Sequence, residues 1–130
     1  MLGVEEQISL HKFAAVKLLI LDQTEQLEAL YEQVKGIATS SKLPINQLQL
    51  SSINAMVLFQ IGEYRGAFEA ASISYSQFSQ RGYVGLFGPL DSMFIMARCQ
   101  WEFGNAREAM DLYIQLRDIS EQWKQWHWYF

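Results

Sequence analysis

The chain has 130 residues, of which half are hydrophobic and 14% are aromatic, and its formal net charge is −4 at pH 7. This size and apolar content are enough for one sizeable core, so we expect a single domain over residues 1–130. The ten Lys and Arg residues are scattered, whereas a nucleic-acid-binding protein carries a clustered basic face, so this class of partner is excluded. The single cysteine excludes an internal disulfide and fits a reducing compartment.

The first residues indicate neither export nor membrane insertion. The N-terminus has no basic segment ahead of a long apolar run, which a secretory signal requires. Residues 18–21 form an apolar run of four after Lys12 and Lys17, whereas a bilayer-spanning helix needs about 20 apolar residues. We therefore expect a soluble, cytoplasmic protein.

Apolar residues recur at helical spacing along the whole chain and predict an all-α protein of about six helices. Pro44 and Pro89 each lie at the start of an apolar-periodic segment, where a helix tolerates proline. No stretch alternates like a strand except the short segment 83–88, whose glycines favour a loop. The predicted helices cover residues 5–20, 23–39, 45–61, 64–81, 89–103 and 106–122.

The chain repeats itself at the turns between these helices. Gly104 lies forty-two residues after Gly62, which in turn lies forty residues after Asp22. Glycine suits such a turn because it tolerates the positive φ that ends a helix. The residues that precede each turn by seven are Ala15, Ala55 and Ala97, and those that follow it by five are Leu27, Ala67 and Ala109. This register predicts three helical hairpins, at residues 5–39, 45–81 and 89–122.

These alanines and glycines resemble the marks of the tetratricopeptide repeat, a helix–turn–helix unit. The resemblance implies a right-handed α-solenoid of three hairpins. The chain departs from the family in its period, which is 40 to 42 residues rather than about 34. The family's tryptophan in the first helix is replaced by His11, Ser51 and Met93.

Little in the sequence indicates catalysis. The two histidines, His11 and His127, and Cys99 lie far apart, and no metal-binding spacing such as HxxxH, CxxC or HExxH occurs. Arg98 beside Cys99 could lower the pKa of the thiol, but a buried, inert cysteine is the favoured interpretation. The spacing G-x-x-G-x-x-G at residues 82–88 lacks the close glycine pair and the lysine of nucleotide-binding loops. We expect no enzymatic activity, no metal and no cofactor.

The resemblance also implies a function, because the first helices of such repeats line a concave groove. The register assigns to that groove Lys12, Val16, Met56, Phe59, Phe94, Arg98 and Trp101. The expected partner is a helix or an extended apolar segment of another protein, held by a chaperone-like or assembly-factor-like binding module. A competing interpretation makes Phe59 and Trp101 packing residues between repeats. A second function is also open: a regulatory region of a larger signalling protein or transcription regulator, binding a peptide or small effector.

The last eight residues, 123–130, form an unusual aromatic tail. Continued as a helix, Trp123, Trp126 and Phe130 share one face. Three interpretations stay open: the tail folds back over the last hairpin, it pairs with a partner or with a second copy as a homodimer, or it is the cut end of a longer array. A membrane anchor is disfavoured because the segment has no basic face.

Overall fold

The computed structural model describes residues 3–39, 41, 43–81 and 89–128, without the side chains at positions 5, 9, 89 and 123–128. This part of the chain contains helices and no strand, which confirms the predicted all-α class. The helices are α1 Val4–Ile20, α2 Thr24–Thr39, α3 Pro44–Gln60, α4 Tyr64–Gln80, α5 Pro89–Glu102 and α6 Ala106–Trp128. The first five agree with the predicted bounds to within one residue at each end.

The three turns inside the hairpins have the same backbone geometry. Asp22, Gly62 and Gly104 adopt positive φ angles of 58°, 88° and 83°. In the second hairpin, the Gly62 N–H donates to the Phe59 carbonyl at 3.1 Å, and the next N–H donates to the Leu58 carbonyl at 2.9 Å. These two bonds define the Schellman ending of a helix. The same pair recurs as Asp22 to Leu19 with Gln23 to Leu18, and as Gly104 to Trp101 with Asn105 to Gln100.

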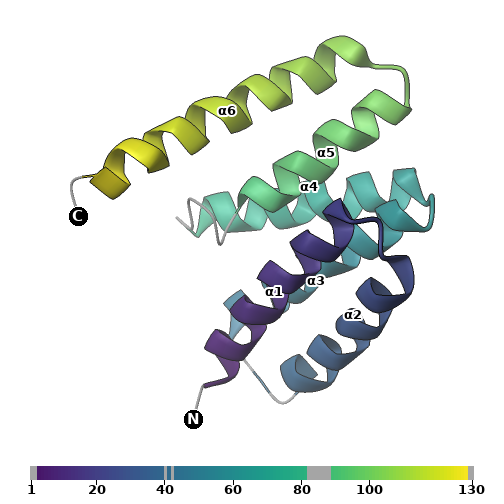
Figure 1. Ribbon diagram of the computed structural model, residues 1–130, viewed down its shortest axis with the longest axis vertical. Helices are drawn as coiled ribbons and strands as arrows, with labels where there is room; N and C mark the ends of the chain where they lie inside the picture. Colours follow the sequence, from purple (N-terminus) through teal and green to yellow (C-terminus); the bar gives the residue numbers. More distant parts are fainter. Residues whose placement is uncertain (1–2, 40, 42, 82–88, 129–130) are drawn as a thin grey trace.

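Successive helices pack as hairpins that stack on one another (Figure 1). The first helices of the hairpins also touch one another, α1 with α3 and α3 with α5, and α2 and α4 contact the first helix of the hairpin that follows. Small residues stand where the helices of a hairpin approach closely, and a larger side chain would hold the helices apart there. These fully buried residues include Ala15, Ala55 and Ala97 in the first helices, and Ala67 and Ala109 in the second.

α6 is longer than predicted. Its backbone continues through Trp128 in line with the helix (Figure 1), so residues 123–128 do not fold back over the last hairpin. The proposed second interface of Trp123, Trp126 and Phe130 concerns side chains outside the described residues. The glycines of residues 82–88 lie outside them as well.

Candidate partner-binding surface

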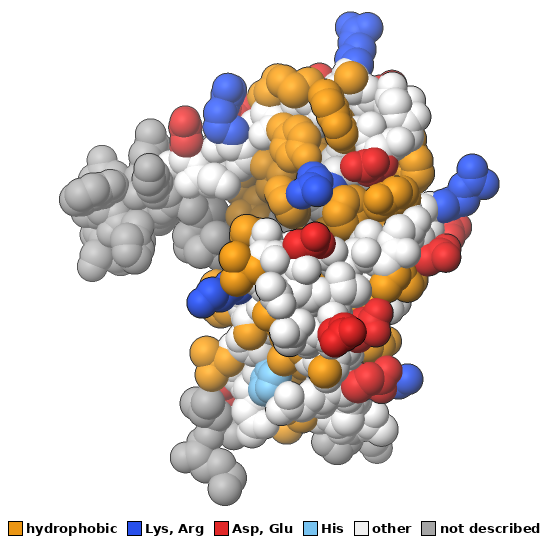
Figure 2. Space-filling model, turned by 45° about the vertical axis from the view of Figure 1, so that its right-hand side comes forward, with side chains coloured by type: hydrophobic (Ala, Val, Ile, Leu, Met, Phe, Trp, Pro, Cys, Tyr) orange, Lys and Arg blue, Asp and Glu red, His pale blue; other side chains and the backbone are white. Residues whose placement is uncertain are grey.

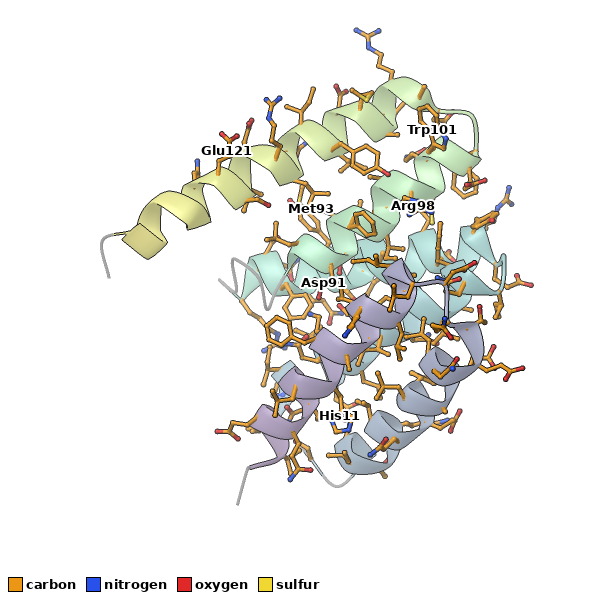
Figure 3. The ribbon with its side chains drawn as sticks, viewed as in Figure 1. His11, Asp91, Met93, Arg98, Trp101 and Glu121 are labelled. Carbon is orange, nitrogen blue, oxygen red and sulfur yellow. The ribbon has the colours of Figure 1, made fainter. Side chains whose placement is uncertain are left out.

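The residues assigned to the groove share the inner side of the first helices but differ widely in exposure. Met56 and Phe59 of α3 are buried, as is Lys12 of α1. Val16 and Phe94 are half-buried, and Arg98 and Trp101 on α5 are exposed (Figure 3). A partner can therefore reach only the α5 side of the predicted groove and Val16.

An ion pair between α1 and α5 accounts for the burial of Lys12. Lys12 Nζ lies 2.7 Å from Asp91 Oδ2, and the Lys12 side chain is only 3% exposed. Nζ also lies 5.0 Å from the centre of the Phe78 ring of α4, in cation–π geometry. The residue of α5 that follows Asp91 also contacts α3, since Ser92 Oγ lies 3.4 Å from Ser52 Oγ. The expectation that Lys12 lines an open groove is wrong, because its side chain is buried against Asp91 and Phe78.

Burial controls the ionisation of this pair. It lowers the pKa of Lys12, although the nearby Asp91 carboxylate opposes this change. It raises the pKa of Asp91, which Lys12 opposes in the same way. Sequence reasoning assigned no role to Asp91. The available signal was Lys12 itself, because the other two repeats have Ser52 and Phe94 at that position and a buried lysine needs an anion.

Arg98 forms a compact cluster with two aromatic side chains. The centre of its guanidinium lies 4.9 Å from the Phe59 ring centre and 5.8 Å from that of Phe94. Phe59 in turn contacts Tyr64 of α4, with ring centres 5.2 Å apart. Stacked in this way, the guanidinium covers Phe59 and stays exposed itself. Within the described part of the chain Arg98 has no ion-pair partner, so its N–H groups remain accessible to a ligand.

Trp101 is exposed at a register position that is buried in the other two hairpins. The same register position is only 7% exposed at Leu19 and at Phe59, but 57% exposed at Trp101. Phe59 in the second hairpin is covered by Arg98 of α5, the first helix of the third hairpin. The structure therefore makes Phe59 a packing residue between hairpins and places Trp101 on the surface beside Arg98 (Figure 3).

A second surface feature lies at the turn edge and was not predicted. Phe68 of α4 and Phe103 after α5 meet edge to face, with ring centres 6.1 Å apart and planes at 67°. Together with Arg65, Glu69 and Asn105 they line an open pocket of about 530 Å³. Hydrophobic side chains also gather on the upper half of the face in Figure 2, the half nearer α5 and α6. The sequence carried a signal for this edge, since an apolar residue precedes each of the three turns. In the structure these residues, Leu21, Ile61 and Phe103, are all exposed.

The remaining reactive side chains have structural surroundings. Cys99 is buried, and desolvation raises the pKa of its thiol to about 11, so its thiolate is disfavoured despite the neighbouring Arg98. The His11 ring nitrogen Nδ1 lies 2.6 Å from the Gln7 carbonyl oxygen, one helical turn earlier. Among the described residues no three His, Cys, Asp or Glu side chains are grouped to hold a metal ion.

Comparison of the chain with protein-family models, with curated proteins and with solved structures gave no match. None of the helices in the described part of the chain combines the length and hydropathy needed to cross a bilayer.

Proposed function

We propose that this chain is a non-catalytic protein-interaction module, built as a right-handed stack of three hairpins like those of tetratricopeptide repeats. Its partner is an apolar or amphipathic segment of another protein, in the manner of a chaperone or assembly factor. The partner binds a surface formed by Val16, Phe94, Arg98 and Trp101, which we name the inner surface. The observation that carries the proposal is Arg98, whose guanidinium lies over the rings of Phe59 and Phe94 beside the exposed Trp101.

The repeat architecture is supported by the three hairpins together. Their turns share one pair of Schellman hydrogen bonds, and the alanine seven residues before each turn is buried. Contacts run between neighbouring first helices as well as within hairpins. Stacked helical hairpins of this kind use their inner faces for extended binding surfaces.

The chemistry of the inner surface favours a mainly apolar partner with a polar or acidic group. Trp and Arg are the residues that most often dominate binding energy at protein interfaces. The Arg98 guanidinium already lies over the rings of Phe59 and Phe94, so less conformational entropy should be lost when it binds than for an uncontacted arginine. Trp101 offers a large apolar area three residues further along α5.

The inner surface is smaller than the groove inferred from the sequence. Lys12, Met56 and Phe59 are buried, so they act by packing and not by contact with a partner. A short segment of a few turns therefore fits better than a long helix lying along all three hairpins. Affinity should depend on two anchors, Arg98 and Trp101.

The test is a selection of peptides from a random library on the immobilised protein, followed by fluorescence anisotropy of the selected peptides. We expect Arg98→Ala and Trp101→Ala each to weaken binding by about tenfold or more. Arg117→Ala is the matched control, since Arg117 is an exposed arginine on α6, away from this surface. Peptides that bind both variants as tightly as the wild type would remove Arg98 and Trp101 from the site, and the absence of any selected peptide would contradict the function.

A further inference from the structure

The two ends of the hairpin stack expose apolar residues at positions that are buried between hairpins. At the first end, Phe13 of α1 is 50% exposed, whereas its equivalents Ile53 and Ile95 are at most 1% exposed. Leu10, one turn earlier on the same side, is 54% exposed. The difference arises because α3 and α5 each pack on the preceding hairpin, whereas the packing of α1 within the described residues is against α2 and α3.

The other end shows the complementary pattern. Trp101 of α5 is exposed although Leu19 and Phe59 are buried at the same position. On α6, Met110 is 52% exposed, whereas its equivalent Phe68 on α4 is half-buried against Phe103. The first hairpin thus exposes the positions that α3 and α5 bury against the hairpin before them. The third hairpin exposes the positions that the first and second hairpins bury against the hairpin after them.

The contacts seen between the second and third hairpins predict how two ends would meet. Each contact can be moved by one hairpin, so that its residue on the second hairpin is replaced by the equivalent residue on the third, and its residue on the third hairpin by the equivalent residue on the first hairpin of another copy. Arg98 over Phe59 then becomes Val16 against Trp101. The contact of Phe103 with Phe68 becomes Leu21 against Met110, and that of Ser92 with Ser52 becomes Leu10 against Phe94. All three transferred pairs are apolar.

We infer that the chain associates end to end with a second copy of itself, α1 of one copy covering α5 and α6 of the next. The occupant is a second copy because both halves of the junction belong to this chain and match pair by pair. Such an interface is heterologous, since each copy uses two different surfaces and keeps one end free. Association therefore continues into an open series of copies unless a ring closes.

One residue opposes this association. Lys17 lies on the exposed side of α1, between Phe13 and Leu21, where the other hairpins have the buried Val57 and Cys99. Its stem can cover apolar surface while its ammonium stays in water, at a cost in binding free energy. Lys17→Val restores the residue type of the second hairpin and should strengthen the association.

The experiment is sedimentation equilibrium of the 130-residue chain and its variants over a range of concentrations. Leu10→Glu blocks the α1 end and Met110→Glu blocks the α6 end; both residues are exposed, so helicity by circular dichroism should be unchanged. We expect the wild type to associate with rising concentration, Lys17→Val to associate at about tenfold lower concentration, and each Glu variant to be monomeric. An equimolar mixture of the two Glu variants should form dimers and nothing larger. The unblocked α6 end of Leu10→Glu can pair with the unblocked α1 end of Met110→Glu, and both ends of the resulting dimer are blocked.

Ile73→Glu is the control, because Ile73 is an exposed residue of α4 away from both ends, and its association should equal that of the wild type. Wild-type and Lys17→Val chains that both stay monomeric would overturn the inference, as would a mixture of Glu variants that stays monomeric. Phe94, Val16 and Trp101 also belong to the inner surface, so the test avoids them. Monomeric Met110→Glu should still bind the selected peptides, which separates a failure of end-to-end association from a failure of the proposed function.

Discussion

Lys12 and Asp91 join the first and the fifth helix through a buried ion pair 2.7 Å long, passing over the helix that lies between them. The pair connects the first hairpin directly to the third. It therefore opposes separation of these two hairpins, and it keeps Lys12 itself out of reach of a partner.

Removing one member of this pair should destabilise the protein strongly. Lys12→Met leaves Asp91 buried without its counter-charge, and we expect a loss of about 3–5 kcal/mol in the free energy of unfolding. The double variant Lys12→Met with Asp91→Leu leaves no buried charge and should be near the wild type or above it. Urea unfolding followed by circular dichroism measures both. Arg117→Met, at an exposed pair, is the control and should change stability by less than about 0.5 kcal/mol.

The buried thiol of Cys99 should make stability depend on alkaline pH. The pKa of Cys99 is about 11 in the folded chain, against 9.0 for a free thiol, so the folded state holds its proton where the unfolded state has lost it. The contribution of the protonated thiol to the free energy of unfolding is therefore fully present below pH 9.0. It decreases by roughly 2–3 kcal/mol as the pH rises to about 11. The difference in unfolding free energy between the wild type and Cys99→Ala, measured from pH 8 to 11, isolates this effect. A difference that is constant over this range would show that Cys99 is not desolvated.

Introducing a glycine at one turn and removing one at another should change the stability of the protein in opposite directions. Asp22 has a φ of 58°, which strains a residue with a side chain, so Asp22→Gly should stabilise by about 0.5–1 kcal/mol. Gly62→Ala should destabilise by about 1–2 kcal/mol. A Cβ at Gly62 meets no atom within 4 Å, so the cost is one of backbone conformation alone. Thermal unfolding of both variants measures these changes in stability. Two changes of the same sign would contradict the shared turn geometry.

Ala97 should not tolerate a larger side chain. It is fully buried where α5 packs within the stack, so Ala97→Leu should cost about 1–3 kcal/mol through overpacking. Ala14→Leu introduces the same side chain at an exposed position of α1 and should change stability little. Chemical unfolding compares the two, and a neutral Ala97→Leu would contradict close packing at this position.

The local features of this chain were predictable because they depend on neighbours in sequence. Helical periodicity and the two prolines located five helices to within one residue at each end. The spacing of Asp22, Gly62 and Gly104 predicts equivalent turns, and their common positive φ and shared hydrogen bonds confirm this. The end of α6 was missed, since the aromatic residues after position 122 carry no signal that stops a helix.

Exposure of the candidate site was harder to predict, because it depends on how far the hairpins close on one another. Phe59 and Trp101 occupy one register position, yet one is buried under Arg98 and the other is exposed. The register placed both on the inner side without deciding which of them a neighbouring helix covers.

The sequence by itself determined the helices, their turns and the repeat register, since helix formation and helix endings depend on residues within a few positions of each other. Only the tertiary structure decided that Lys12 meets Asp91 and that Phe59 lies beneath Arg98. These contacts join residues far apart in the chain: the first links the first hairpin to the third, and the second links the second hairpin to the third. Burial of Lys12, Met56 and Phe59 leaves only Val16, Phe94, Arg98 and Trp101 of the predicted groove for a partner to reach.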